Sequence, residues 1–391
     1  MTSKIDATLD QALVHAASGN HRLLASLRSW RRTMPDALLQ AALGQNDKSA
    51  LIGDLRLDPD QIAHRQMFPH LHFSCSEELR GHPLEADLRA DRLRTGLMNK
   101  RVLRERNELM AHFFHRGASV LVFKGADLAF SVYPDACCRK VGDIDLLVSE
   151  DSCAIAAEVL RANGWSSDIL YRNGAQDDNL VVGNWSNPEF SVTLDVHTTA
   201  SHHTRKRGAS KVHFEQAVAY DNEVGGVVLG LCPEHGLEQV CCHGLSQNYY
   251  PPVRWAADAH WILGAAGQDF DWDRLLEVAQ NNHSAPVLYV ALSYLALTLE
   301  TNIPGDILSQ LRTMPCRRSF RSAWTYRLDL PNGAKERTEE FLSRFQETYP
   351  DDSTLRASVR LPGFVSASQG ISNPIQALGR LAKKAVLNKR G

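Results

Sequence analysis

The stretch Asp143-Ile144-Asp145-Leu146-Leu147-Val148 decides how the rest of the chain is interpreted. Acidic and aliphatic residues alternate in its first half, which is typical of a β-strand. Residues two apart on a strand point to the same face, so both aspartates should project side by side. Two carboxylates at that separation repel unless a proton or a cation lies between them. Mg²⁺ fits such a pair and keeps positions open for phosphates, although two surface aspartates on an edge strand would give the same pattern.

Segments on either side favour a metal site. Residues 120–123 (Val-Leu-Val-Phe) form a second buried-type strand that leads into Lys124-Gly125, and a helix is expected over 126–133. Residues 191–197 alternate as a third strand, with Asp195 and His197 on one face. Three carboxylates on adjacent strands are what a two-metal site for phosphoryl or nucleotidyl transfer needs. For His197 two roles stay open, orienting an acceptor or filling the strand face.

These motifs resemble the uncharacterised bacterial nucleotidyltransferases of the DNA polymerase β superfamily. The resemblance implies an α+β fold, in which a polymerase-β-like nucleotidyltransferase core with a small mixed sheet is flanked by N- and C-terminal helical regions. It covers residues 100–200 closely and continues loosely through the helical part. The residues that carry it are Phe123-Lys124-Gly125, Tyr133-Pro134, Arg139, Asp143 to Val148 and Leu194-Asp195-Val196-His197, followed by His243, Trp255 to Leu263 and Asp271-Trp272.

The resemblance also implies a set of site residues. The catalytic and metal-binding residues are Asp143, Asp145 and Asp195, which would hold Mg²⁺ or Mn²⁺. The expected co-substrate is an NTP, with ATP the first candidate, and its binding residues are Lys124, Gly125, Arg139 and His197. A glycine at a helix start lets a phosphate approach the backbone, and the lysine adds a point charge.

Two features of this set leave questions open. The superfamily's usual Gly-Ser after the first strand is replaced here by Lys124-Gly125, which departs from the polymerase pattern at the position expected to bind phosphate. Arg139 is expected near the nucleotide phosphates, and the alternative is a salt bridge with one of the strand aspartates.

Composition excludes some classes of protein. The 391 residues carry a formal net charge of −2, whereas a general nucleic-acid binder carries a basic excess, so long DNA or RNA is not expected as a substrate. The eight cysteines show no disulfide or zinc spacing, and no apolar run is long enough for a membrane span, which favours a cytoplasmic protein. The basic C-terminal end could make a weak peripheral contact with a membrane or a partner.

Four regions are expected along the chain: an N-terminal helical region over 1–84, the nucleotidyltransferase core over 85–225, a C-terminal helical region over 226–349 and a partly flexible basic tail over 350–391. Within the first region, the His-, Pro- and Gly-containing stretch 67–84 is expected to be a loop.

The predicted function is Mg²⁺-dependent transfer of a nucleoside monophosphate from an NTP to a hydroxyl of a small molecule, sugar or peptide. A phosphotransferase and a non-catalytic nucleotide-binding scaffold on the same fold are the alternatives. The acceptor is not identified, because its specificity should lie in loops such as 166–189 and 198–212.

Overall fold

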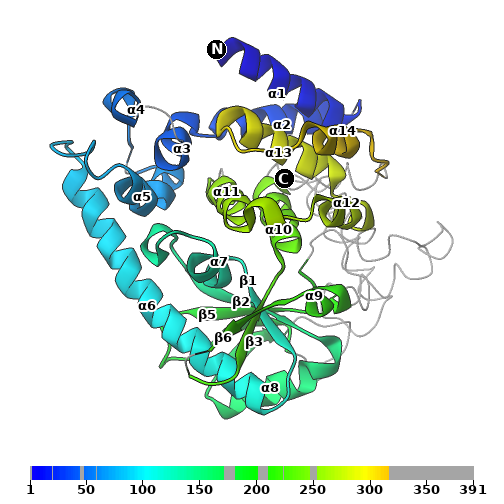
Figure 1. The fold of residues 1–391 in the computed structure, drawn as a ribbon. Coiled ribbons are helices and arrows are strands. Elements are labelled where there is room, and N and C mark those ends of the chain that lie inside the picture. The colour runs from blue at the N-terminus through cyan, green and yellow to red at the C-terminus, as the bar shows by residue number, and fades with distance from the viewer. Residues whose placement is uncertain are drawn as a thin grey trace, which may run out of the picture.

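A seven-stranded mixed sheet forms one half of the molecule (Figure 1). The computed structural model describes residues 2–316, except 20, 45–47, 59, 171–180, 201–209, 223 and 247–252. The strands are β1 (Val120–Phe123), β2 (Asp143–Val148), β3 (Ser166–Leu170), β4 (Gly183–Ser186), β5 (Thr193–His197), β6 (Val218–Asp221) and β7 (Val227–Gly230). Their order across the sheet is β3-β4-β5-β2-β1-β7-β6.

The middle of the sheet is its most apolar part. Strand β2 pairs with β1 in antiparallel and with β5 in parallel orientation, and β1 also pairs with β7 in parallel. One face packs against α6 (Glu85–His115), α7 (Gly125–Ser131) and α8 (Cys153–Ala162), through aliphatic residues such as Val122, Ile144 and Leu160. The opposite face carries a smaller apolar cluster around Phe123 and Leu147, with the short helix α9 (Lys211–Glu215) beside it.

Helices from both ends of the described chain form the other half (Figure 1). A single apolar core runs through them, from Leu9 in the first helix to Leu311 in the last. The regions expected before residue 85 and after residue 225 therefore pack as one helical body. Its members are α1 (Thr2–Ala17), α2 (His21–Thr33), α3 (Asp36–Leu43), α4 (Lys48–Asp54), α5 (Ile62–Ser74), α10 (Pro233–Ser246), α11 (Arg254–Ala266), α12 (Trp272–Asn281), α13 (Ala285–Thr298) and α14 (Gly305–Thr313).

Helix α6 runs along the side of both halves (Figure 1). Its Asn99 side chain donates to the carbonyls of Ala136 and Arg139, at 2.6 Å each, and so fixes the turn that leads into β2. On the same helix, the buried Glu105 carboxylate accepts from the backbone N–H and hydroxyl of Ser191, just before β5. One helix thus positions the approach to both strands that carry the aspartates.

Two details differ from the expectations for the chain. The stretch 67–84 is not a loop from its start, because α5 continues to Ser74 with Pro69 inside it and with Leu71 in the helical core. The sheet also extends past residue 225, since β7 pairs with β1, so the expected boundary falls within the β6–β7 hairpin. The tail over 350–391 lies outside the described residues.

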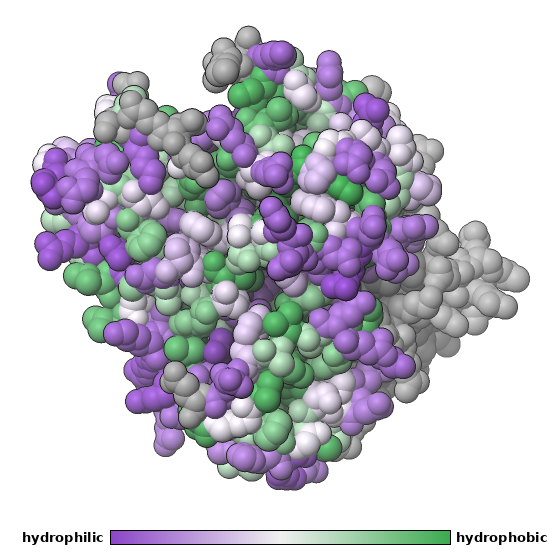
Figure 2. All heavy atoms as spheres, viewed as in Figure 1, coloured by the Kyte–Doolittle hydropathy of each residue, from purple (hydrophilic) through white to green (hydrophobic). Residues whose placement is uncertain are grey.

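On the face drawn in Figure 2, hydrophilic and hydrophobic residues are interspersed over both halves. Across the part of the chain that the structure describes, no helix combines the length and the apolar character needed to cross a membrane. All eight cysteines fall within that part, and all are free thiols.

Candidate active site

Two aspartates from neighbouring strands face each other on the less covered face of the sheet. Asp145 is directly opposite Asp195 in the parallel pairing of β2 with β5. Asp145 is also opposite Phe123 in the antiparallel pairing of β2 with β1, so all three side chains share one face. Asp145 is 3% exposed, whereas Asp195 is partly open to solvent. The predicted alternation of β2 and β5 therefore brings these two carboxylates together.

His197, two residues after Asp195 on β5, lies between the two carboxylates. Its Nε2 is 3.3 Å from Asp145 Oδ1 and 3.1 Å from Asp195 Oδ2. One potential ligand atom from each of the three residues lies within 4.8 Å of the others. We call Asp145, Asp195 and His197 the carboxylate–histidine cluster.

Lys124 adds a second positive group to this cluster. Its ammonium forms an ion pair with Asp145 Oδ1, and the ion pair is largely shielded from solvent. Lys124 links β1 to α7 with φ 56° and ψ −137°, a backbone conformation that is rare for any residue other than glycine. Such strain is typical of functional sites, where the surrounding structure holds a residue in an unfavourable conformation. The lysine thus occupies a position whose backbone would suit the superfamily's usual glycine.

The cations around Asp145 decide its ionisation. Burial raises the pKa of Asp145, but the hydrogen bond from His197 and the charge on Lys124 outweigh it, so the pKa lies below its ordinary value. Burial lowers the pKa of His197, and its hydrogen bonds with Asp145 and Asp195 more than reverse that effect, so its pKa is raised. The two opposite shifts have one cause, the attraction between the Asp145 carboxylate and the His197 ring.

Asp143 lies at the open end of the same strand. It is the first residue of β2, exposed, and opposite Thr193 rather than opposite another acid. Partial loss of hydration and the nearby Asp145 charge raise the pKa of Asp143. Asp143 therefore shares a face with Asp145 but is not one of the three residues whose ligand atoms lie within 4.8 Å.

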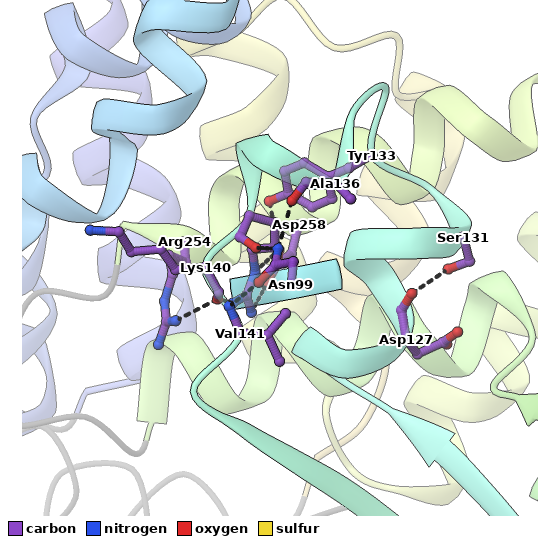
Figure 3. Close-up of polar contacts among 10 residues, drawn as sticks. Asn99, Asp127, Ser131, Tyr133, Ala136, Lys140, Val141, Arg254 and Asp258 are labelled. Carbon is purple, nitrogen blue, oxygen red and sulfur yellow. Dashed lines mark hydrogen bonds and ion pairs between the residues drawn. The ribbon is translucent and has the colours of Figure 1, made fainter. Parts of the chain in front are cut away.

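Arg139 and Gly125 lie against each other beside this strand. The Arg139 guanidinium is buried and binds the Asp258 carboxylate on α11 with two hydrogen bonds, Nε to Oδ1 at 2.9 Å and Nη2 to Oδ2 at 3.0 Å (Figure 3). The Tyr133 hydroxyl donates to the same carboxylate at 2.6 Å. A Cβ at Gly125 would lie 3.1 Å from Arg139 Nη1, so this glycine leaves room for the guanidinium. The alternative expected for Arg139 was a salt bridge to a strand aspartate, and the observed partner is Asp258 instead.

A second arginine, which the sequence analysis missed, lies next to Arg139. Arg254 begins α11, and its Nη1 is 3.5 Å from the carbonyl oxygen of Lys140, the same oxygen that accepts from Arg139 Nη1 (Figure 3). Among the described residues, no carboxylate lies within ion-pair distance of Arg254. The charge on Arg139, together with burial, lowers the pKa of Arg254 to about 10. Asp258 thus serves as the counter-charge for two guanidinium groups, and the pair retains an excess positive charge close to Asp143.

The chemistry of the cluster fits a divalent cation. The two carboxylates are the hard oxygen ligands that Mg²⁺ and Mn²⁺ take, and the alternation of β2 with β5 aims both at one point. The imidazole nitrogen is a softer ligand, so a site that uses all three residues suits Mn²⁺ better than Mg²⁺. Lys124 and His197 both contact the Asp145 carboxylate, and a bound cation would take over part of the compensation of its negative charge.

A mixed sheet that presents acids on two neighbouring strands, flanked by helices, is consistent with a nucleotidyltransferase core. The chain belongs to a family described as uncharacterised nucleotidyltransferases, because the sequence model of that family matches residues 61–300, more than half of the chain. The matched range includes every site residue named above. No curated protein matches the chain.

Proposed function

We propose that the protein transfers a nucleoside monophosphate from an NTP to a hydroxyl group of a small molecule, sugar or peptide. The observation that carries this proposal is the pairing of Asp145 with Asp195 in a nucleotidyltransferase family member. In the reaction, the acceptor hydroxyl loses its proton, a bond forms between its oxygen and the α-phosphorus, and the bond to the leaving pyrophosphate breaks. Mg²⁺ or Mn²⁺, when bound, would neutralise the phosphates and acidify the acceptor hydroxyl.

The acidic residues would bind the cation, and the basic residues would bind the phosphates of the NTP. Asp143, Asp145 and Asp195 would hold the cation, as the sequence analysis expects, with His197 fixing the orientation of two of them. Lys124, whose ammonium lies at Asp145, would bind a phosphate oxygen of the NTP. The excess positive charge at Arg254 favours an anion, and a triphosphate is the anion that this chemistry supplies. Arg139 would act mainly by holding the β2 approach against α11 through Asp258.

Two other functions use the same residues. Transfer of the γ-phosphoryl group differs only in the leaving group, and a nucleotide-binding scaffold would keep the site without turnover. Mass spectrometry of candidate acceptors incubated with an NTP and Mg²⁺ separates these possibilities. A gain of a nucleoside monophosphate, with release of pyrophosphate, supports the proposal. A gain of a single phosphate would replace it with the phosphotransferase. A cytoplasmic location and ATP as the preferred NTP remain predictions.

A further inference from the structure

A cavity of about 180 Å³ lies beside the Lys124 turn, at the junction of the sheet with the helical body. Helix α7 forms one wall, the β6–β7 hairpin a second, and helices α10 and α11 the remainder. Most of the lining side chains are apolar, including Leu128, Val240 and Ile262. The lining side chains with oxygen or nitrogen atoms are those of Lys124, Asp127, Ser131, Tyr220 and Gln239.

Two of these polar side chains are buried without a partner for one of their atoms. Asp127 is 4% exposed and Gln239 is 2% exposed. Among the described residues, Asp127 Oδ1 and Gln239 Nε2 have no hydrogen-bond partner. An unsatisfied buried donor or acceptor destabilises the fold, and a ligand that supplies the missing partner removes that cost. Two side chains that line the cavity, Asp127 and Gln239, therefore each hold one buried polar atom without a partner in the described part of the chain.

The nearest cation to Asp127 does not supply a partner for its Oδ1. Arg106 gives its hydrogen bonds to Asn107 Oδ1 and to the carbonyl of Ala126 instead. Burial raises the pKa of Asp127 to about 7, and the charge on Arg106 offsets part of that rise. A Cβ at Gly230 would lie 2.9 Å from Asp127 Oδ2, so the glycine at the end of β7 makes room for the carboxyl. In Figure 3, Asp127 and Ser131 lie apart from the residues around Asp258.

We propose that this cavity receives the nucleobase of the NTP, with Asp127 and Gln239 binding the polar edge of the base. The inference rests on the proposed function, since it places the base next to the site proposed for the triphosphate. Lys124 connects the two places, because it lines the cavity while its ammonium binds Asp145.

The chemistry of the walls favours a base over the other parts of the substrates. A flat heterocycle buries well against aliphatic walls, and each nucleobase carries a donor and an acceptor on its polar edge. A polyhydroxylated sugar would leave most of its hydroxyls unpaired against these walls. An anionic group would meet the Asp127 carboxyl. Neither therefore fits the cavity as well as a nucleobase.

Gly236 provides a matched pair of variants for testing the cavity. It lies on α10 in the cavity wall, and a Cβ added there would meet only Ile262 Cδ1, at 3.7 Å, which is an ordinary contact. Gly236→Ala should therefore be tolerated, whereas Gly236→Leu extends a side chain into the cavity. Ala265→Phe is a second blocking variant at an exposed lining position, where the fold is not at risk.

The experiment compares binding of an NTP and of inorganic tripolyphosphate, both with Mg²⁺, by calorimetry on the full chain. We expect Gly236→Leu and Ala265→Phe to weaken NTP binding by at least about tenfold, and to change tripolyphosphate binding by less than about twofold. Gly236→Ala should bind both ligands as the wild type does. NTP binding that is unchanged in both blocking variants, or lost together with tripolyphosphate binding in the folded variants, would overturn the nucleobase assignment. If the wild type binds neither ligand, the proposed function fails, and this inference fails with it.

Discussion

Asp145 lies directly across from Asp195 in the parallel pairing of β2 with β5, and the His197 imidazole reaches both carboxylates. The register of the two parallel strands fixes which residues lie opposite each other. A shift of one residue in that register would separate the two acids and turn one of them to the other face of the sheet. Helix α6 holds the entry to each strand, through Asn99 before β2 and Glu105 before β5. The geometry of the acids thus depends on a long helix that carries none of them.

Asp143→Asn should abolish turnover and leave the fold intact. The substitution removes charge but almost no volume at an exposed strand start, so the free energy of unfolding should change by less than about 0.5 kcal/mol. The substitution also removes the repulsion between the Asp143 and Asp145 carboxylates, which favours the folded state. Activity assays with chemical denaturation test both parts. Near-normal turnover in a folded Asp143→Asn protein would remove Asp143 from the metal site.

The strained backbone at Lys124 should cause a difference in stability between two variants of this residue. Lys124→Gly and Lys124→Ala both remove the ammonium, but only glycine adopts φ 56° and ψ −137° without steric cost. We expect the glycine variant to be more stable than the alanine variant by about 1 kcal/mol in urea denaturation. Both should bind NTP weakly, because both lack the charge. Equal stability of the two variants would show that the backbone at residue 124 is relaxed.

Removing the counter-charge of the arginine pair should destabilise the protein strongly. Asp258→Asn leaves Arg139 buried without a carboxylate and Arg254 beside it, and breaking a buried ion pair typically costs about 3–5 kcal/mol. Tyr133→Phe is the matched control, since it deletes one hydrogen bond to the same carboxylate and should cost about 1–2 kcal/mol. Denaturation of both variants measures the difference. A loss in Asp258→Asn no larger than that in Tyr133→Phe would contradict the role given to Asp258.

His197 should make stability depend on pH in a defined direction. Its folded-state pKa is raised above the ordinary value of 6.5, so its protonation stabilises the fold below that pH. This contribution is lost as pH rises through the raised folded-state pKa. The buried His70, His213 and His235 have lowered pKa values and act in the opposite sense, so only a difference measurement isolates His197.

The measurement compares the wild type with His197→Gln in chelator-containing buffer. The stability advantage of the wild type should be larger at pH 6 than at pH 8.5. An advantage that grows with pH would contradict the raised pKa and the proton that His197 shares with Asp145 and Asp195.

The spacing of apolar residues along the sequence predicted the central strands of the sheet. The alternation in 143–148 marks β2 at its observed bounds, and the apolar run over 120–123 likewise marks β1. The short strands β3, β4, β6 and β7 were not placed individually, because their four or five residues carry little periodicity of their own.

The arrangement of the candidate site could be predicted from the sequence only in part. Asp145, Asp195 and His197 come together because strand alternation and register fix their positions. The pairing of Arg139 with Asp258 and the excess charge at Arg254 could not be predicted, since both depend on how α11 packs more than a hundred residues further along the chain. No local pattern marks Asn99 either, although its side chain holds the approach to β2.

The most direct test of the central claim is calorimetric binding of an NTP with and without Mg²⁺, in the wild type and in Asp145→Asn. The matched control is Asp151→Asn, an exposed acid beyond the opposite end of β2. The proposed site predicts Mg²⁺-dependent binding to the wild type and to Asp151→Asn, and its loss in Asp145→Asn. Binding that is unchanged in folded Asp145→Asn, or independent of the cation, would contradict a nucleotidyltransferase site at the carboxylate–histidine cluster.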